Sequence, residues 1–257
     1  EISCSLVGSE MCIRDRATAG PNHQMTMDWK QLISDKRFGK EASHKQRSER
    51  RTEFQRDFDR LIFSAPFRRM QNKTQVFPLP GSIFVHNRLT HSLEVSSVGR
   101  SLGTDVAREL LQKHPELRRT EISPIAEIVS AACLAHDMGN PPFGHSGEKA
   151  IRSFFSEGKG RMLKDYQSAE GERLTEGEWN DITRFDGNAN TFRVLTHQFS
   201  GRRPGGFVMT YSTLAAIVKY PYSSSLCGEK HKFGFFESEQ ADFRKIADEL
   251  GMPLSLI

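Results

Sequence analysis

The stretch SPIAEIVSAACLAHDMGNPPFGHSGE, residues 123–148, decides the fold of this chain. Pro124 stands where proline is common, at the first position of a helix, and the residues after it are apolar nearly all round. That pattern is typical of a buried helix. Gly139 and the prolines that follow it end this helix just after His136 and Asp137. We therefore expect a buried helix whose last turn presents an adjacent histidine and aspartate.

Other parts of the chain also show helical spacing. A helix over residues 88–113 is predicted by apolar residues that recur mostly at four-residue steps and draw one stripe, namely Leu89, Leu93, Val98, Leu102, Val106 and Leu110. Further helices are expected over about 48–70, from 146 to 154, over about 188–199 and 210–219, and in a polar segment ending near residue 251. Because no strand-like alternation is sustained and no repeat occurs, we expect an all-α fold.

The domain organisation follows from the remaining segments. Residues 1–16 and 254–257 resemble translated sequencing adaptor, and we expect neither to belong to the fold. We expect residues 17–47 to form a flexible N-terminal arm and residues 48–253 to form one helical domain. Within that domain, residues 156–182 are rich in Gly and charged residues and predict an exposed insertion.

Composition excludes several classes of protein. With 257 residues the chain is too long for a disulfide-stapled miniprotein, and no apolar run reaches the roughly 20 residues of a membrane span. The four cysteines show no paired spacing, and the N-terminus lacks the features of a signal peptide. We therefore expect a cytoplasmic protein without a membrane partner. The net charge of +4 is small, so binding to an anion would depend on local clusters of basic residues.

A metal site is the chemistry that these residue types favour. His136 and Asp137 place an imidazole nitrogen and a carboxylate oxygen at the same depth, where one ion can contact both. An isolated pair of this kind is more often a turn aspartate beside a core histidine. His91, on the apolar edge of a separate helix, makes the metal interpretation stronger because it can converge on the pair. Mixed nitrogen and oxygen ligands suit Mn, Fe, Co, Ni or Zn, and suit Mg less well.

The chain resembles a known family at this point. One histidine followed by a distant His-Asp pair is similar to the HD superfamily of metal-dependent phosphohydrolases. The strings RTEFQRDFDRLIFS, RLTHSLEVSSVGRSLG and LAHDMGNPPFGHSGE resemble the deoxyguanosine triphosphate triphosphohydrolase (dGTPase) family, and the resemblance covers about residues 48–250. It implies an HD-domain helical bundle.

The resemblance also implies roles for individual residues. His91, His136 and Asp137 match metal ligands, and His145 with Glu148 matches the catalytic pair. Residues three apart near a helix start face one another, so Glu148 could orient the His145 imidazole. The positions that match substrate contacts are Gln75, Val76, Arg88, Asn188, Lys219 and Tyr220.

The implied reaction is metal-dependent hydrolysis of a deoxynucleoside triphosphate, dGTP first, to a deoxynucleoside and tripolyphosphate. The implied cofactor is a divalent cation, Mg or Mn foremost, with Co, Fe, Ni or Zn as alternatives, and the implied assembly is a homo-oligomer. The family's fourth metal ligand is an aspartate that matches no residue of this chain. We therefore expect a domain truncated at its C-terminal side, with weakened metal affinity or none.

Two alternatives remain. The first is another HD-superfamily phosphohydrolase that acts on a different nucleotide. The second is a nucleic-acid-binding or regulatory protein, because basic residues outnumber acidic ones between Lys45 and Lys73 and could follow a single-stranded phosphate backbone. The simpler explanation of those basic residues is a solvated helix face, with some arginines near a nucleotide.

Overall fold

The computed structural model describes residues 27–43, 51–73, 87–201, 204–229 and 231–253. Within them the α-helices are α2 (Trp29–Leu32), α3 (Glu53–Ile62), α4 (Ala65–Arg69), α5 (Arg88–Lys113), α6 (Arg119–Ile122), α7 (Ile125–Ala135), α8 (His145–Ser156), α9 (Glu176–Thr183), α10 (Gly187–Thr196), α11 (Tyr211–Ile217) and α12 (Gln240–Glu249). Short 3₁₀ helices are η2 (Glu41–Ser43), η3 (Met70–Asn72), η4 (Lys159–Lys164), η5 (Ser224–Leu226) and η6 (Glu237–Glu239). The described residues pair only through isolated β-bridges, so the predicted all-α class is confirmed.

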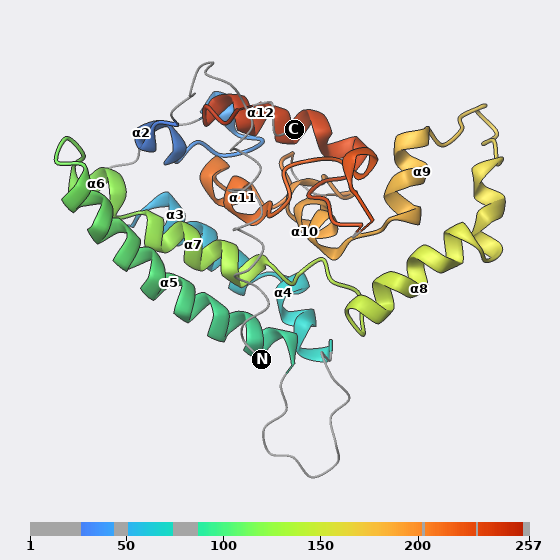
Figure 1. Ribbon diagram of the computed structural model, residues 1–257, viewed down its shortest axis with the longest axis horizontal. Coiled ribbons are helices and arrows are strands. Elements are labelled where there is room, and N and C mark those ends of the chain that lie inside the picture. Colours follow the sequence, from blue (N-terminus) through green and yellow to red (C-terminus); the bar gives the residue numbers. More distant parts are fainter. Residues whose placement is uncertain (1–26, 44–50, 74–86, 202–203, 230, 254–257) are drawn as a thin grey trace, which may run out of the picture.

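The longest helix, α5, lies along the buried helix α7 (Figure 1). The two backbones approach closely because α5 turns small residues toward α7. A Cβ added at Gly103 would stand 2.8 Å from the Cα of Ala126, and one added at Gly99 would stand 2.6 Å from the sulfur of Cys133. This close pairing fixes the start of α5 relative to the end of α7.

The buried face of α5 differs from the predicted apolar stripe. The helix itself has the predicted bounds, but its buried residues are Arg88, Ser92, Ser96, Gly99, Gly103 and Ala107. Of the predicted stripe, Leu93, Val98, Leu102 and Val106 are exposed, whereas Leu89 and Leu110 pack partly against the core. The reason is steric, since only small side chains fit between helices that approach this closely.

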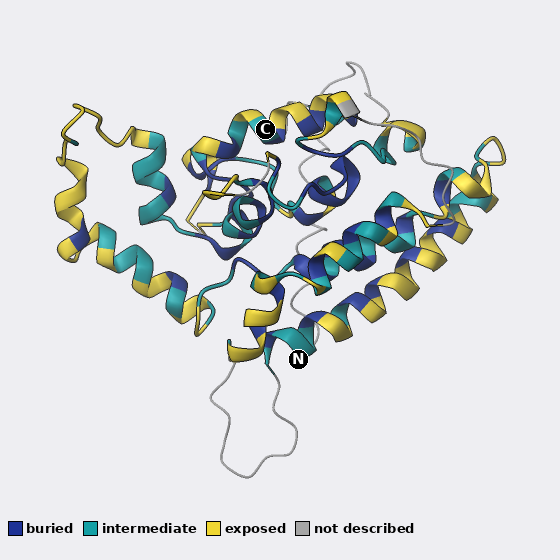
Figure 2. Ribbon diagram, turned by 180° about the vertical axis from the view of Figure 1, so that it is seen from behind, coloured by how far each residue is buried: buried dark blue, intermediate teal, exposed yellow. Residues whose placement is uncertain are grey.

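The main hydrophobic core is formed where α7, α10, α11 and α12 meet, and Figure 2 shows the buried residues gathered there. Aromatic rings from distant segments pack within it. The Phe235 ring stacks on that of Phe243 at 4.7 Å between centroids, and Phe192 meets Phe243 edge-on at 5.9 Å. The C-terminal helix α12 therefore contributes directly to the core, although its sequence is mostly polar.

Residues 27–43 fall within the segment predicted to be a flexible arm, yet they are fastened to the helical body. Arg37 is buried and donates to Oδ1 of Asp57 at 2.7 Å and to the Val208 carbonyl at 2.6 Å. The Tyr211 backbone N–H donates to the Lys36 carbonyl at 2.9 Å. The structure therefore differs from the expected flexible arm at these residues. The attachment depends on hydrogen bonds of the buried Arg37, which the spacing of apolar residues does not predict.

Two other segments also differ from the sequence patterns. The helix predicted over 48–70 divides at Ser64, whose side chain caps α4 by accepting from the Phe67 N–H. The predicted insertion at 156–182 is mostly exposed, as expected, but it contains η4 and most of α9, and Asp181 of α9 is buried. Among the described residues, no helix is both long and apolar enough to cross a membrane. The adaptor-like ends, 1–16 and 254–257, lie outside the described residues.

Candidate metal centre

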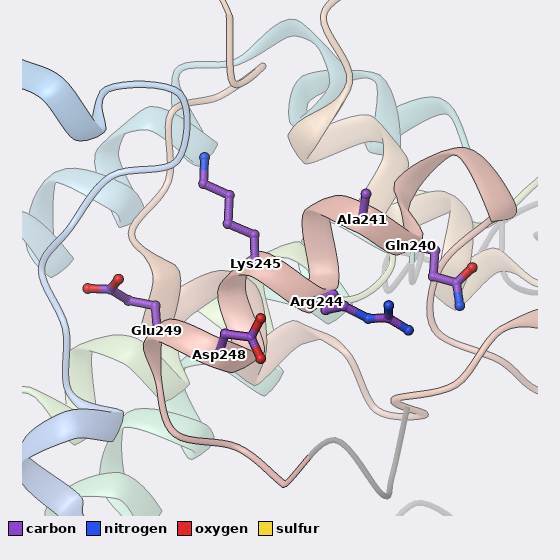
Figure 3. A pocket seen from close by; sticks show the side chains of 6 residues that line it. All are labelled: Gln240, Ala241, Arg244, Lys245, Asp248 and Glu249. Carbon is purple, nitrogen blue, oxygen red and sulfur yellow. The ribbon is translucent and has the colours of Figure 1, made fainter.

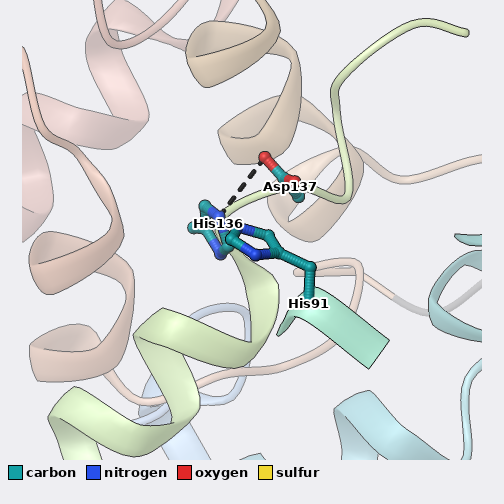
Figure 4. Close-up of side chains that lie close together, drawn as sticks. All are labelled: His91, His136 and Asp137. Atoms are coloured by element: carbon teal, nitrogen blue, oxygen red, sulfur yellow. Dashed lines mark ion pairs between the residues drawn. The ribbon is translucent and has the colours of Figure 1, made fainter. Parts of the chain in front are cut away.

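Three potential metal ligands meet where α5 begins and α7 ends. His91 lies in the second turn of α5, His136 forms the C-cap of α7, and Asp137 follows it (Figure 4). One ligand atom from each of these residues lies within 4.8 Å of the others. The centroids of the two imidazole rings lie 5.3 Å apart and the ring planes meet at 64°, a T-shaped arrangement. The predicted convergence of these three side chains is therefore present.

Local capping explains why His91 stands at this place. Asn87 caps α5 by accepting from the Thr90 N–H at 2.9 Å, and the Thr90 hydroxyl accepts in return from the Asn87 N–H at 3.3 Å. This reciprocal capping box fixes the first turn of the helix. The next residue, His91, is then directed toward the end of α7.

The hydrogen bonds around His136 leave one of its nitrogens suited to a metal. Its Nδ1 lies 2.7 Å from the Cys133 carbonyl, which can only accept, so the Nδ1 atom carries the proton. Nε2 then keeps its lone pair, and it lies 3.3 Å from Oδ1 of Asp137. Burial lowers the pKa of His91 below its ordinary value. Burial thus favours the neutral form of His91, which is the form that binds metal.

The carboxylate of Asp137 is held by two neighbours. Arg88, which is only 5% exposed, donates from NH1 to Oδ2 of Asp137 at 2.7 Å. The Asn140 side-chain amide donates to the other carboxylate oxygen. These contacts make Arg88 part of the buried side of the centre rather than a surface cation. Asn140 was not singled out from the sequence, although it lies three residues after Asp137 in the same motif.

The segment from Asp137 to α8 passes beside Arg88 just before it reaches His145. Phe143 and Gly144 both adopt positive φ, at 65° and 54°, which turns the chain sharply. A Cβ added at Gly144 would stand 2.8 Å from NH2 of Arg88, so a glycine is needed beside that guanidinium. His145 follows as the first residue of α8 and is exposed. It lies near the metal ligands in the chain but is not one of their cluster.

The sequence suggests that Glu148 pairs with His145, but the structure gives Glu148 other partners. Its side chain is buried, and Oε1 accepts from the Gly187 N–H at 2.9 Å. The other oxygen lies 3.5 Å from Nζ of Lys232. Since no hydrogen bond joins Glu148 to His145 among the described residues, the glutamate links the first turn of α8 to α10.

The predicted substrate contacts are divided by the structure. Arg88 lies at the centre, whereas Asn188 donates to Oδ1 of Asp186 at 2.8 Å at the start of α10. Lys219 lies over the Tyr220 ring at 5.4 Å, and no contact brings either residue to the metal cluster. The remaining two predicted contacts, Gln75 and Val76, lie outside the described residues.

A separate hollow occurs on α12, where the side chains shown in Figure 3 line it. None of them belongs to the His-His-Asp cluster. Its charges are of both signs, and one of them, Lys245, is paired with Glu41. This surface has the character of a solvated helix face.

Comparison with known proteins supports the significance of the cluster. Residues 88–182, which include all three potential ligands, match the HD domain family. Proteins named deoxyguanosinetriphosphate triphosphohydrolase-like are 43% identical over 235 residues in Synechocystis (88% of this chain, 52% of the relative) and 45% identical over 235 residues in Pseudomonas aeruginosa (88% and 50%). A Yersinia pseudotuberculosis protein named deoxyguanosinetriphosphate triphosphohydrolase is 34% identical over 260 residues (88% and 49%).

The chain spans about half the length of the curated relatives that it matches. HD domains depend on a metal, and the His-His-Asp cluster lies within the matched region. The helical fold, the cluster and the extended similarity agree, and the chain belongs to the HD-domain family of dGTP triphosphohydrolase-like proteins.

Proposed function

We propose that this chain carries the metal centre of a deoxynucleoside triphosphate triphosphohydrolase, with dGTP as the first substrate to test. The observation that carries the proposal is the convergence of His91, His136 and Asp137 at the junction of α5 and α7. The names of the relatives, which refer to dGTP, support the choice of substrate. The products would be a deoxynucleoside and tripolyphosphate.

The donor set fits a divalent cation. Two imidazole nitrogens and one carboxylate oxygen are ligands that Mn, Fe, Co, Ni and Zn accept readily. We favour Mg or Mn, because phosphate oxygens of the substrate would supply further hard ligands. When bound, the cation would supply a Lewis acid that acidifies water and offsets phosphate charge.

The protein's own side chains would divide the remaining work. Arg88, which pairs with Asp137, would donate from its guanidinium to a phosphate oxygen of the substrate. His145, exposed at the start of α8, would donate a proton to the departing 5′ oxygen. In the same step a water oxygen would bond to the α-phosphorus and release a proton to solvent, while the bond from phosphorus to the 5′ oxygen breaks. Glu148 would act on His145 indirectly, by holding α8 against α10.

The metal site is tested by binding Mn²⁺ to the purified chain. We expect wild type to bind one ion, with an affinity weakened because the family's fourth ligand is unmatched, and we expect His136→Ala to lose that binding because one of the three remaining ligands is removed. His114→Ala is the matched control, since His114 is a partly exposed histidine at the other end of α5 that pairs with Glu116. Equal Mn²⁺ binding by wild type and His136→Ala would contradict the proposed centre.

The reaction is tested by product analysis with dGTP and Mn²⁺. We expect deoxyguanosine and tripolyphosphate, and we expect His145→Ala to retain Mn²⁺ but lose turnover by about a hundredfold or more, as for a general acid. Release of orthophosphate or pyrophosphate would instead favour another nucleotide phosphohydrolase. Unchanged turnover in His145→Ala would remove its role as proton donor.

The nucleic-acid-binding alternative has less support from the structure. Several cations of the basic segment have internal partners: Arg51 pairs with Asp59, and Arg60 donates to the Phe207 carbonyl at 3.0 Å. Lys73 donates to carbonyls beside the metal centre. The proposal also includes a cytoplasmic homo-oligomer. Native mass measurement of the purified chain tests whether it is an oligomer.

A further inference from the structure

We propose that Thr191 and Asn190, in α10, are positioning residues for the His136–Asp137 ligand pair. The inference rests on the proposed metal centre and extends it to a helix that supplies no ligand. Residues 136–139 form a turn beyond the end of α7, so their backbone groups are not paired along a continuing helix. Buried backbone groups need partners from elsewhere in the fold. Much of that support comes from α10.

Thr191 contacts both ends of the turn through one hydroxyl. Its Oγ1 accepts from the Gly139 N–H at 3.0 Å and lies 3.1 Å from the carbonyl of His136, to which it can donate. The side chain is 1% exposed, so water does not replace these contacts. The same oxygen also lies 3.0 Å from the Gly187 carbonyl inside α10. The two carbonyls share the single hydroxyl proton, and the bond from the Gly139 N–H ties the turn that carries the ligands to α10.

Asn190 supplies the second contact from the same helix. Its side-chain amide donates to the Gly139 carbonyl at 2.7 Å, so both backbone groups of Gly139 are bound by neighbouring residues of α10. Lys73 adds to this support by donating to the carbonyls of Met138 at 3.2 Å and Asn140 at 3.0 Å. The turn is therefore held from two separate parts of the chain.

The backbones of the turn and of α10 are too close for intervening side chains. A Cβ at Gly139 would stand 2.1 Å from the backbone nitrogen of Thr191, and one at Gly187 would stand 2.0 Å from Oδ1 of Asn140. This proximity sets the direction in which His136 and Asp137 leave the backbone. Partners that orient metal ligands commonly affect metal affinity by about 10- to 100-fold.

Thr191→Val tests the proposal because it keeps the shape of the side chain and removes its hydroxyl. Thr196→Val is the matched control: Thr196 is also buried in α10, at 3% exposed, and its hydroxyl donates at 2.9 Å to the carbonyl four residues earlier. Thr196 has no hydrogen bond to the ligand turn among the described residues. Thr191→Ser restores a hydroxyl and serves as the conservative variant.

Two measurements on the full chain distinguish positioning from general stability. We expect Thr191→Val to weaken Mn²⁺ binding about tenfold and to speed hydrogen exchange at the Gly139 amide, with recovery in Thr191→Ser. Thr196→Val should lose a similar amount of thermal stability without either change. Wild-type Mn²⁺ affinity or unchanged Gly139 exchange in Thr191→Val would overturn the inference. If wild type binds no Mn²⁺, the proposed function fails, and with it the positioning of a metal ligand.

Discussion

At the scale of single residues, Asp181 is a buried carboxyl group whose pKa the fold raises. It is 5% exposed, its Oδ2 accepts from the Glu237 N–H at 2.7 Å, and burial, with Glu237 and Glu239 nearby, raises its pKa from 3.8 to about 6. The folded chain therefore holds this proton more tightly than the unfolded chain does. The contribution of Asp181 to the free energy of unfolding is therefore fully present below about pH 4 and is lost as the pH rises through about 6.

Asp181→Asn should reduce the loss of stability between pH 4 and pH 7. The amide keeps an oxygen for the Glu237 N–H and carries no charge to desolvate, so the difference from wild type should approach about 3 kcal/mol at pH 7. Urea denaturation at several pH values measures it. Asp105→Asn is the control, because that side chain is 64% exposed. Parallel pH profiles for wild type and Asp181→Asn would contradict the prediction.

At the scale of elements, the contact between α5 and α7 matters most because it joins the helices that carry the three ligands. Gly103→Ala should destabilise the fold by about 1–3 kcal/mol, since its new Cβ would stand 2.8 Å from the Cα of Ala126 and push the helices apart. It should also weaken Mn²⁺ binding, because His91 would move relative to His136.

Leu102→Ala is the matched control for this contact. Leu102 neighbours Gly103 but is 55% exposed, so the free energy of unfolding should change by no more than about 0.5 kcal/mol. Both variants are compared by urea denaturation and Mn²⁺ titration. Equal free energies of unfolding for the two variants would contradict the prediction, because α5 and α7 would then accommodate the added methyl group without loss of stability.

The same elements show what could be predicted from sequence. The spacing of apolar residues and the positions of Gly and Pro predicted that α5 and α7 exist and where they end. The convergence of His91 on the His-Asp pair followed from these helices. The buried face of α5 could not be read from apolar residues, because a close helix pair selects glycine and serine. The start of α9 had a missed signal, the capping box of Thr175 and Glu178.

The site was less predictable than the helices that form it. The i, i+3 spacing of His145 and Glu148 suggested a pair, but Glu148 instead binds Gly187 and Lys232, which are remote in sequence. The turn at residues 136–139 is likewise held by hydrogen bonds with Asn190 and Thr191 of α10, which are remote from it in sequence. Spacing along one helix predicts which residues share a face, and only packing between helices decides what that face meets.

At the scale of the whole molecule, one buried charge cluster joins three distant parts of the chain. Arg37, in the N-terminal segment, pairs with Asp57 of α3, which is 0% exposed. The second carboxylate oxygen of Asp57 accepts from the backbone N–H of Thr210 at 2.9 Å and from its hydroxyl at 2.6 Å. Thr210 in turn caps α11, so the cluster ties the N-terminal segment to the core helices.

Arg37→Met should therefore destabilise the whole fold rather than one terminus. Asp57 would stay buried with its hydrogen bonds to Thr210 but without its cation, a loss that typically costs about 3–5 kcal/mol. Arg37→Met/Asp57→Asn should recover part of it, because no charge is then left unpaired. Arg108→Ala, which breaks a pair that is 64% exposed on both sides, should cost no more than about 0.5 kcal/mol. If urea denaturation gives Arg37→Met the same stability as Arg108→Ala, the N-terminal segment does not contribute to the fold through this cluster.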